Sequence, residues 1–293
     1  MIKYFFHLRL IENVIPAEVL KGVINGTQEF FDRMKGFGVN ISFMGGETAD
    51  VGDVVRTMAV NGTMTARWPK AKLITNEKIK AGNVIVGLAG FGQANYETSY
   101  NSGLASNGLT SARHDILHKT YGARFPESYD TALDESVVYI GPHRITDEIK
   151  DGKRTTTIGD LLLSPTRTFA PVMKELLENH FDAINGLVHC SGGGQTKCLK
   201  FVSDNVRIVK DNLFEPPIIF KLIQEASKSG DREMYQVFNM GTRLEIYTNE
   251  KDADTIINVA DKFGVAAQVI GRVEESEKKE LVIKSNSIEL IYY

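Results

Sequence analysis

Three short segments of this 293-residue sequence carry residue types that could bind a phosphorylated ligand. The first is Gly45-Gly46-Glu47-Thr48-Ala49-Asp50, with Asp53 close behind it. Paired glycines let a backbone approach a ligand closely, and the carboxylates of Glu47, Asp50 and Asp53 are the hard oxygen ligands that Mg²⁺ prefers. Taken alone, the segment is equally consistent with a turn at a strand end whose acids are solvated.

The second segment is Ser106-Asn107-Gly108, which leads into an expected helix that begins at Leu109. Exposed backbone N–H groups and the helix dipole at such an N-terminus favour an anion such as phosphate. An ordinary helix cap is the simpler interpretation of this segment by itself.

The third segment is His189-Cys190-Ser191-Gly192-Gly193-Gly194, where an expected strand ends at a histidine and three glycines open a helix. In physical terms this arrangement resembles a phosphate or nucleotide cradle. It matches neither the P-loop pattern nor the dinucleotide-binding glycine pattern. A structural histidine at a strand end is the alternative.

Two further motifs are weaker. Ser164-Pro165-Thr166-Arg167 places a fixed turn before an arginine, and Arg167 could bind a phosphate with two parallel hydrogen bonds or form a surface salt bridge. Phe238-Asn239-Met240-Gly241 separates an expected helix from a strand, and on its own indicates only a helix C-cap.

The apolar spacing predicts the elements that position these motifs. Helices are expected over residues 16–34, 109–121, 170–181, 196–202, 217–229 and 251–263. Strands are expected over 39–44, 54–66, 84–89, 186–190, 243–247 and 266–273, with a final hairpin of 280–284 and 288–292. Together they predict an α+β fold with mixed α/β layers, divided near residue 80 into a small domain (1–80) and a larger one (81–293). The small part has unsatisfied sheet edges, which invite pairing with another chain.

Composition excludes several classes of protein. The net charge is −3 and no basic stripe is present, so we expect no nucleic-acid partner. Two cysteines, Cys190 and Cys198, are too few for a disulfide scaffold and fit a reducing cytosol. No stretch approaches the ~20 apolar residues that span a bilayer, and the apolar start is too short for a signal peptide, so a cytoplasmic location is expected.

The order of the motifs is more specific than any one of them. GGETAD, SNGLTSAR, SPTR, HCSGGG, FNMG and IGRVEES follow one another as in the phosphoribosylformylglycinamidine cyclo-ligases (AIR synthetases), which the chain resembles over residues 11–275. The resemblance is to the longer variant, with an insertion at about 115–160.

The resemblance implies an enzyme that uses ATP and Mg²⁺ to close the ring of formylglycinamidine ribonucleotide. It places ATP at Gly45, Gly46, Glu47, Thr48 and Asp50, and the metal at Glu47 and Asp53. It places the substrate at Ser106, Asn107, Gly108, Arg167 and Gly192 to Gly194. His189, with Glu47, would act at the reacting centre, His189 as a polariser or proton handler. A homodimer paired through its N-terminal sheets is also implied.

The sequence departs from the family pattern ahead of residue 16. The family's DG-x-GTK and N-x-ND-L segments, which serve the triphosphate and Mg²⁺, are not found there. We therefore expect an N-terminally truncated chain that binds ATP weakly by itself, and micromolar Mg-ATP binding by calorimetry would contradict that expectation.

Two alternatives remain open at this stage. One is another ATP-using member of the superfamily: a selenide water dikinase, a thiamine-monophosphate kinase or a hydrogenase-maturation protein. His189 before the glycines disfavours the kinases, which usually have an aspartate there. The other is a non-catalytic fragment or partner that keeps the fold.

Overall fold

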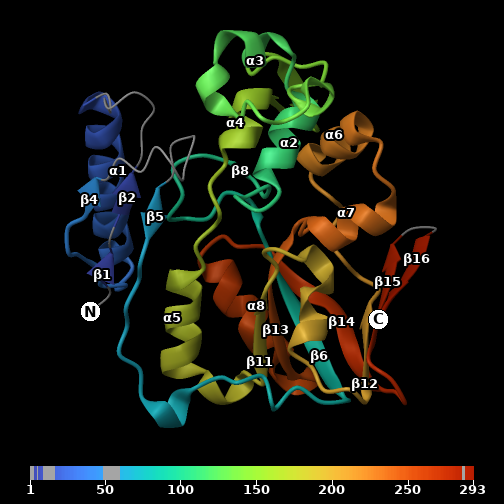
Figure 1. Ribbon diagram of the computed structural model, residues 1–293. Coiled ribbons are helices and arrows are strands. Elements are labelled where there is room, and N and C mark those ends of the chain that lie inside the picture. Colours follow the sequence, from blue (N-terminus) through green and yellow to red (C-terminus); the bar gives the residue numbers. More distant parts are fainter. Residues whose placement is uncertain (1–2, 5, 9–16, 49–59, 286–287) are drawn as a thin grey trace. The chain divides into compact units, whose positions relative to one another are not determined.

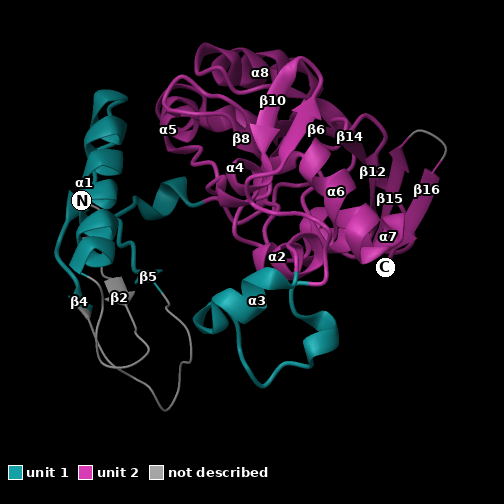
Figure 2. Cartoon of the chain, turned by 90° about the horizontal axis from the view of Figure 1, so that it is seen from above, with its two compact units in different colours: residues 1–73, 119–139 teal, residues 74–118, 140–293 magenta. Residues whose placement is uncertain are grey.

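The computed structural model describes the chain except for residues 1–2, 5, 9–16, 49–59 and 286–287 (Figure 1). It groups the chain into two compact units (Figure 2). Unit 1 consists of residues 1–73 and 119–139, and unit 2 of residues 74–118 and 140–293. Residues 119–139, which are part of the expected insertion, thus belong to unit 1. The domain boundary near residue 80 stays a prediction.

Unit 1 is built around one long helix. Helix α1 (Ala17–Gly36) buries Phe31 and Met34 on one face, as the apolar spacing of the sequence predicts. Strand β1 (Lys3–Tyr4) pairs in parallel with β3 (Ser42–Phe43), and β2 (Phe6–Leu8) lies between β4 (Glu47–Thr48) and β5 (Asn61–Gly62). The remaining elements are η1 (Lys70–Lys72), α3 (Thr120–Arg124), η2 (Pro126–Ser128) and η3 (Glu135–Val137).

Three predicted elements, at 39–44, 54–66 and 109–121, differ from the structure. The strand at 39–44 is only Ser42–Phe43 long and is not buried. Residues 54–59 of the long strand lie outside the described residues, and 60–66 are exposed, with a strand at Asn61–Gly62 and a single bridge at Thr65. The helix at 109–121 ends at Ile116, because Leu117 turns extended and bridges to His143.

Unit 2 is organised by one mixed sheet with the strand order β11-β13-β6-β14-β12-β15-β16. Neighbouring strands are antiparallel except β12 and β15. The inner strands β6 and β13 are almost wholly buried, as the apolar run of 84–89 predicts for β6. The strands are β6 (Asn83–Ala89), β11 (Gly186–His189), β12 (Val206–Lys210), β13 (Thr242–Asn249), β14 (Ala267–Glu275), β15 (Glu280–Ser285) and β16 (Ile288–Tyr292).

Helices complete this unit (Figure 1). Helix α8 (Ala253–Lys262) packs on β6 and β14 through Ile256 and Val259, and α5 (Ala170–Asn179) packs on α8. Helix α2 (Leu109–Ile116) contacts α6 (Ile218–Ser227), and α7 (Asp231–Val237) contacts the 3-10 helix η5 (Gly194–Lys200). The predicted α+β class is confirmed.

The other elements of unit 2 are short. They are the pair β7 (Phe91–Gly92) and β8 (Asn101–Ser102), the hairpin β9 (Glu148–Asp151) and β10 (Arg154–Thr157), α4 (Ile158–Leu163), η4 (Phe181–Ala183) and η6 (Glu250–Asp252). None of the described helices combines the length and the apolar character that crossing a bilayer requires.

Candidate functional site

His189 occupies the end of the edge strand β11, as the sequence predicts. The residue is exposed, and its ring makes an edge-to-face contact with Phe169. Partial burial of the ring and the positive charges of Arg243 and Lys197 lower the pKa of His189 to about 4. The imidazole is therefore neutral near pH 7, with a nitrogen able to accept a proton.

The glycine loop turns sharply away from this strand. Gly194 has a φ of +48°, and a Cβ there would come 2.4 Å from the carbonyl oxygen of Phe238, so only glycine fits. Ser191 accepts a hydrogen bond from the ammonium group of Lys197. A Cβ on Gly192 would stand 3.6 Å from the side-chain nitrogen of Asn107. The loop after His189 thus passes beside Asn107.

The Ser106-Asn107-Gly108 segment is held by contacts from two other motifs. The backbone N–H of Ser106 donates to the hydroxyl of Thr166 at 3.2 Å. Gly108 has a φ of +77°, and a Cβ there would clash at 2.4 Å with the ring of Phe238. Motifs that are 60 or more residues apart in sequence are therefore brought together, and the structure places Asn107 and the loop after His189 in one cluster.

The Phe238-Asn239-Met240-Gly241 motif is the support for this cluster rather than a simple helix cap. The side-chain nitrogen of Asn239 donates to the carbonyl of Gly103, and its side-chain oxygen accepts from the backbone N–H of Gly241. Its backbone carbonyl accepts from the buried side chain of Gln195. Asn239 therefore ties the segment before Asn107 to the end of the glycine loop.

Arg243 is a residue of the cluster that the sequence interpretation missed. It lies on β13 and is 2% exposed. Its guanidinium group donates to the carbonyl of Cys190 at 2.8 Å and to the side-chain oxygen of Asn107 at 3.3 Å. The signal in the sequence was a charged residue within the expected strand 243–247.

A second buried polar group joins Lys210 on β12 to Glu245 on β13. The ammonium group of Lys210 donates to Glu245 and, at 2.7 and 3.0 Å, to the backbone and side-chain oxygens of Gln195. Tyr247 donates to the other oxygen of Glu245 at 2.9 Å, and the Cys190 thiol donates to Glu245 at 3.2 Å. Burial and the Glu245 carboxylate raise the pKa of Cys190, so that thiol stays protonated and unreactive.

Arg167 is held by the protein itself, and its predicted role in binding the substrate stays a prediction. It is 3% exposed and donates two hydrogen bonds to the carboxylate of Glu97 and two to the carbonyls of Ala89 and Phe91. The alternative of a surface salt bridge is wrong, because Arg167 is buried and pairs with the half-buried Glu97. With four of its N–H groups bonded to protein, Arg167 mainly fixes the turn that carries Thr166.

The Gly45-Gly46-Glu47 segment belongs to unit 1. Gly45 has a φ of +96°, which fits a tight turn before β4, and Glu47 is exposed at the start of that strand. Asp50, Asp53 and the side chain of Thr48 lie outside the described residues. Among the residues that are described, no three potential metal-binding side chains come together. The nucleotide and metal roles of this segment therefore stay predictions.

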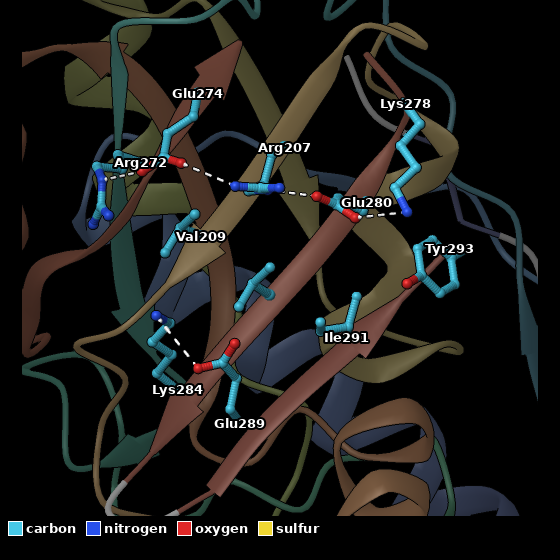
Figure 3. Close-up of a pocket in the computed structure, with 11 residues that line it drawn as sticks. Arg207, Val209, Arg272, Glu274, Lys278, Glu280, Lys284, Glu289, Ile291 and Tyr293 are labelled. Carbon is cyan, nitrogen blue, oxygen red and sulfur yellow. Dashed lines mark hydrogen bonds and ion pairs between the residues drawn. The ribbon is translucent and has the colours of Figure 1, made fainter. Parts of the chain in front are cut away.

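Two pockets of unit 2 lie outside this cluster. One, of about 370 Å³, borders the Ser164-Pro165 turn and Tyr100. The other, of about 360 Å³, lies on β12, β14, β15 and β16 (Figure 3). There Arg207 is set between Glu274 and Glu280, and Lys284 pairs with Glu289. Its charges compensate one another, and it contains none of the predicted site residues.

Comparison with known proteins agrees with the order of the motifs. The family described as "AIR synthase related protein, C-terminal domain" matches residues 80–284. Similar curated proteins include the phosphoribosylformylglycinamidine cyclo-ligases of Methanocaldococcus jannaschii, 35% identical over 91% of this chain, and Methanococcus vannielii, 28% identical over all of it. The chain spans 63% and 70% of the lengths of these two relatives.

Solved structures share the fold at low sequence identity. The E. coli hydrogenase maturation protein HypE has a TM-score of 0.57 at 14% identity, with 100% of this chain and 72% of HypE covered. T. maritima PurL, complexed with FGAR, has a TM-score of 0.53 at 15% identity, with 98% of this chain and 38% of PurL covered. The resemblance expected from the motifs is confirmed: the chain belongs to the AIR synthase-related family.

Proposed function

We propose that this chain acts as an ATP-dependent phosphoribosylformylglycinamidine cyclo-ligase of purine biosynthesis. In the proposed reaction the γ-phosphoryl group of ATP moves to the formyl oxygen of formylglycinamidine ribonucleotide, leaving ADP. The amidine-side nitrogen then attacks the activated carbon, the C–O bond breaks, and phosphate leaves as the ring of aminoimidazole ribonucleotide closes.

The observation that carries this proposal is the cluster in unit 2. Asn107 comes from one motif and the loop that follows His189 from another. Arg243 donates to the Asn107 side chain and to the carbonyl of Cys190, the residue after His189, and Gly192 lies close to Asn107. The side-chain nitrogen of Asn107 offers N–H donors to an oxygen of the substrate. The curated relatives named cyclo-ligases at 28–35% identity give the same activity independent support.

His189 fits the role of proton acceptor in the ring closure. The attacking nitrogen must lose a proton, and a neutral imidazole near pH 7 can take it. The low pKa makes His189 a weak base, so the proton would pass on rapidly to solvent at its exposed side. Arg243 and Lys197, whose positive charges act on His189, would favour the negatively charged phosphoryl group in the same space.

For ATP we propose Gly45, Gly46, Glu47, Thr48 and Asp50, with Mg²⁺ held by Glu47 and Asp53. Mg²⁺ would neutralise charge on the triphosphate during phosphoryl transfer. The support is chemical: an exposed carboxylate follows a glycine turn of positive φ. Binding of Mg-ATP by the full chain, compared with Glu47→Gln, tests this assignment by calorimetry.

We further propose a cytoplasmic homodimer that pairs through unit 1. The described strands of this unit are short, and apolar side chains of residues 60–73 are exposed, among them Met64, Trp68 and Leu73. Sedimentation at increasing concentrations of the full chain tests this. A single species at the monomer mass at every concentration would contradict it.

The activity itself is tested with the full chain, ATP, Mg²⁺ and formylglycinamidine ribonucleotide. We expect ADP and aminoimidazole ribonucleotide in equal amounts, both dependent on the substrate. Two histidine variants sharpen the test: His189→Gln should lose the activity, and His180→Gln, at the end of α5, should keep it. ATP hydrolysis without substrate dependence would contradict the proposal.

A further inference from the structure

Arg243 occupies an irregular position in the central sheet. The register between β13 and β6 shifts between Thr242 and Leu244, so Arg243 is the residue at the β-bulge. Bulges redirect a side chain locally and are often found beside functional sites. Gly90, at the end of β6, leaves the space: a Cβ there would come 2.9 Å from the Cβ of Arg243. The fold thus makes room for this one side chain.

The contacts of Arg243 connect two parts of the candidate site. The backbone carbonyl of Arg243 accepts a hydrogen bond from the Cys190 N–H at 2.8 Å, and its Nη1 donates to the Cys190 carbonyl at 2.8 Å. Its Nη2 donates to the side-chain oxygen of Asn107. Because the side-chain oxygen of Asn107 accepts this hydrogen bond, its side-chain nitrogen points toward Gly192.

The charge of Arg243 is not balanced by an acid in the described part of the chain. Burial lowers the pKa of Arg243, and no carboxylate is among the groups that shift it. Its Nε, buried, finds no hydrogen-bond acceptor among the described residues. A buried cation without a carboxylate partner costs stability, which indicates that the residue is held there for a role in the site.

We propose that Arg243 is a positioning residue of the candidate site, which orients the side-chain amide of Asn107 as a hydrogen-bond donor and anchors the loop that begins at Cys190. It acts through Asn107 and the loop rather than by touching the reacting atoms. Only the kinetic consequences of this proposal rest on the proposed function.

Arg243 also acts on His189 electrostatically. The charged groups that act on the His189 ring are Arg243 from β13 and Lys197 from η5, and its aromatic neighbour is Phe169. Both charges favour the neutral imidazole. Removing the charge of Arg243 should therefore raise the pKa of His189 from about 4 towards its usual value of 6.5.

The first experiment needs no activity. In the isotope-labelled full chain, the His189 ring and the Asn107 side-chain amide are followed by NMR during a pH titration. Arg243→Met should raise the His189 pKa and shift the Asn107 amide resonances. Arg243→Lys keeps the charge, but a single ammonium nitrogen cannot occupy both Nη positions. It should shift the Asn107 amide while the His189 pKa stays low.

The control is Arg207→Met, which removes a charge of the same type from β12 of the same sheet, on the exposed pocket face. It should change neither signal. Unchanged Asn107 amide resonances in Arg243→Met would overturn the proposal. If that variant does not fold, unchanged Asn107 resonances in Arg243→Lys would overturn it equally.

The second experiment measures ring closure. Both Arg243 variants should lower kcat/KM by about 10- to 100-fold, the effect of losing a charge-assisted hydrogen bond. Wild-type kcat/KM in Arg243→Lys would overturn the proposal. If the wild-type chain forms no product, the proposed function fails, whereas the NMR comparison still decides the role of Arg243.

Discussion

Two buried cations of unit 2 illustrate different uses of charge. Lys210 is fully buried, and its ammonium group contacts the Glu245 carboxylate and two oxygens of Gln195. Arg243 is almost as buried, but within the described part of the chain its guanidinium group donates to a backbone carbonyl and to the Asn107 amide oxygen. The ammonium group of Lys210 thus has its hydrogen-bond acceptors and its counter-charge within the protein, as a structural residue would. Arg243 keeps its charge uncompensated next to the candidate site.

The difference is also visible in the directions of their pKa shifts. Burial by itself would lower the pKa of Lys210, but Cys198 and Glu245 outweigh burial, and the pKa is raised. The pKa of Arg243 is lowered, because burial is not offset by a carboxylate. We infer that Lys210 serves folding and that Arg243 serves the site at some cost to folding.

Replacing Lys210 should have the largest effect. Lys210→Met leaves the Glu245 carboxylate buried without its cation, and we expect a loss of about 3–5 kcal/mol in the free energy of unfolding. Urea denaturation of the full chain measures it. Adding Glu245→Gln should recover part of the loss, because neither charge then remains.

A matched exposed pair provides the control. Lys221 pairs with Glu215 at 2.7 Å, and both side chains are at least half exposed. Lys221→Met should therefore cost no more than about 1 kcal/mol. Equal losses of unfolding free energy in Lys210→Met and Lys221→Met would contradict the structural role of Lys210.

Replacing His189 should affect turnover rather than folding. His189→Gln removes the proton acceptor, and we expect kcat to fall at least about 100-fold, equivalent to about 2.7 kcal/mol. Initial rates of product formation measure it, with denaturation curves to show that stability is retained. Wild-type turnover in this variant would assign His189 a structural role at the end of β11.

Replacing Arg243 should change stability least among the buried charges. Arg243→Met removes an uncompensated cation but also two hydrogen bonds, so we expect a change of no more than about 1 kcal/mol in unfolding free energy. The same denaturation series as for Lys210→Met gives the value. A loss as large as that of Lys210→Met would make Arg243 a structural residue like Lys210.

The smallest expected effect is a pH dependence of stability from His189, because solvent screens the charges around this exposed side chain. Its folded pKa of about 4 lies below the unfolded value of 6.5, so between these pH values the unfolded chain binds more protons. Stability from this group should therefore rise from pH 4 to 6.5 and be constant above. The wild type should lose more stability than His189→Gln as pH falls through this window, and parallel curves would contradict the shift.

The positions of several helices and strands that end at the motifs could be predicted from the sequence. Residues 186–190 were expected as a strand and the structure has Gly186–His189, so His189 was correctly placed at a strand end. Helix α1 and the final hairpin were also predicted, because their apolar periodicity is strong and local.

The partners that define the site could not be predicted in the same way. Arg243 and Asn107 are 136 residues apart, and Lys210 and Glu245 are 35 apart, so no local pattern links them. Charged residues in a strand also suggest a solvent-exposed face. On β13, however, Arg243 and Glu245 are both buried, because they contact residues from other parts of the sequence. The burial of Arg167 was missed for the same reason, since its carboxylate partner Glu97 is 70 residues away.

The account depends most on Asn107 and His189 forming one binding site, and a ligand titration tests this directly. Formylglycinamidine ribonucleotide is added to the isotope-labelled full chain while the Asn107 amide and His189 ring signals are followed by NMR. We predict that both sets of signals shift together and saturate at the same ligand concentration. Saturable binding that leaves both sets unchanged would contradict the account.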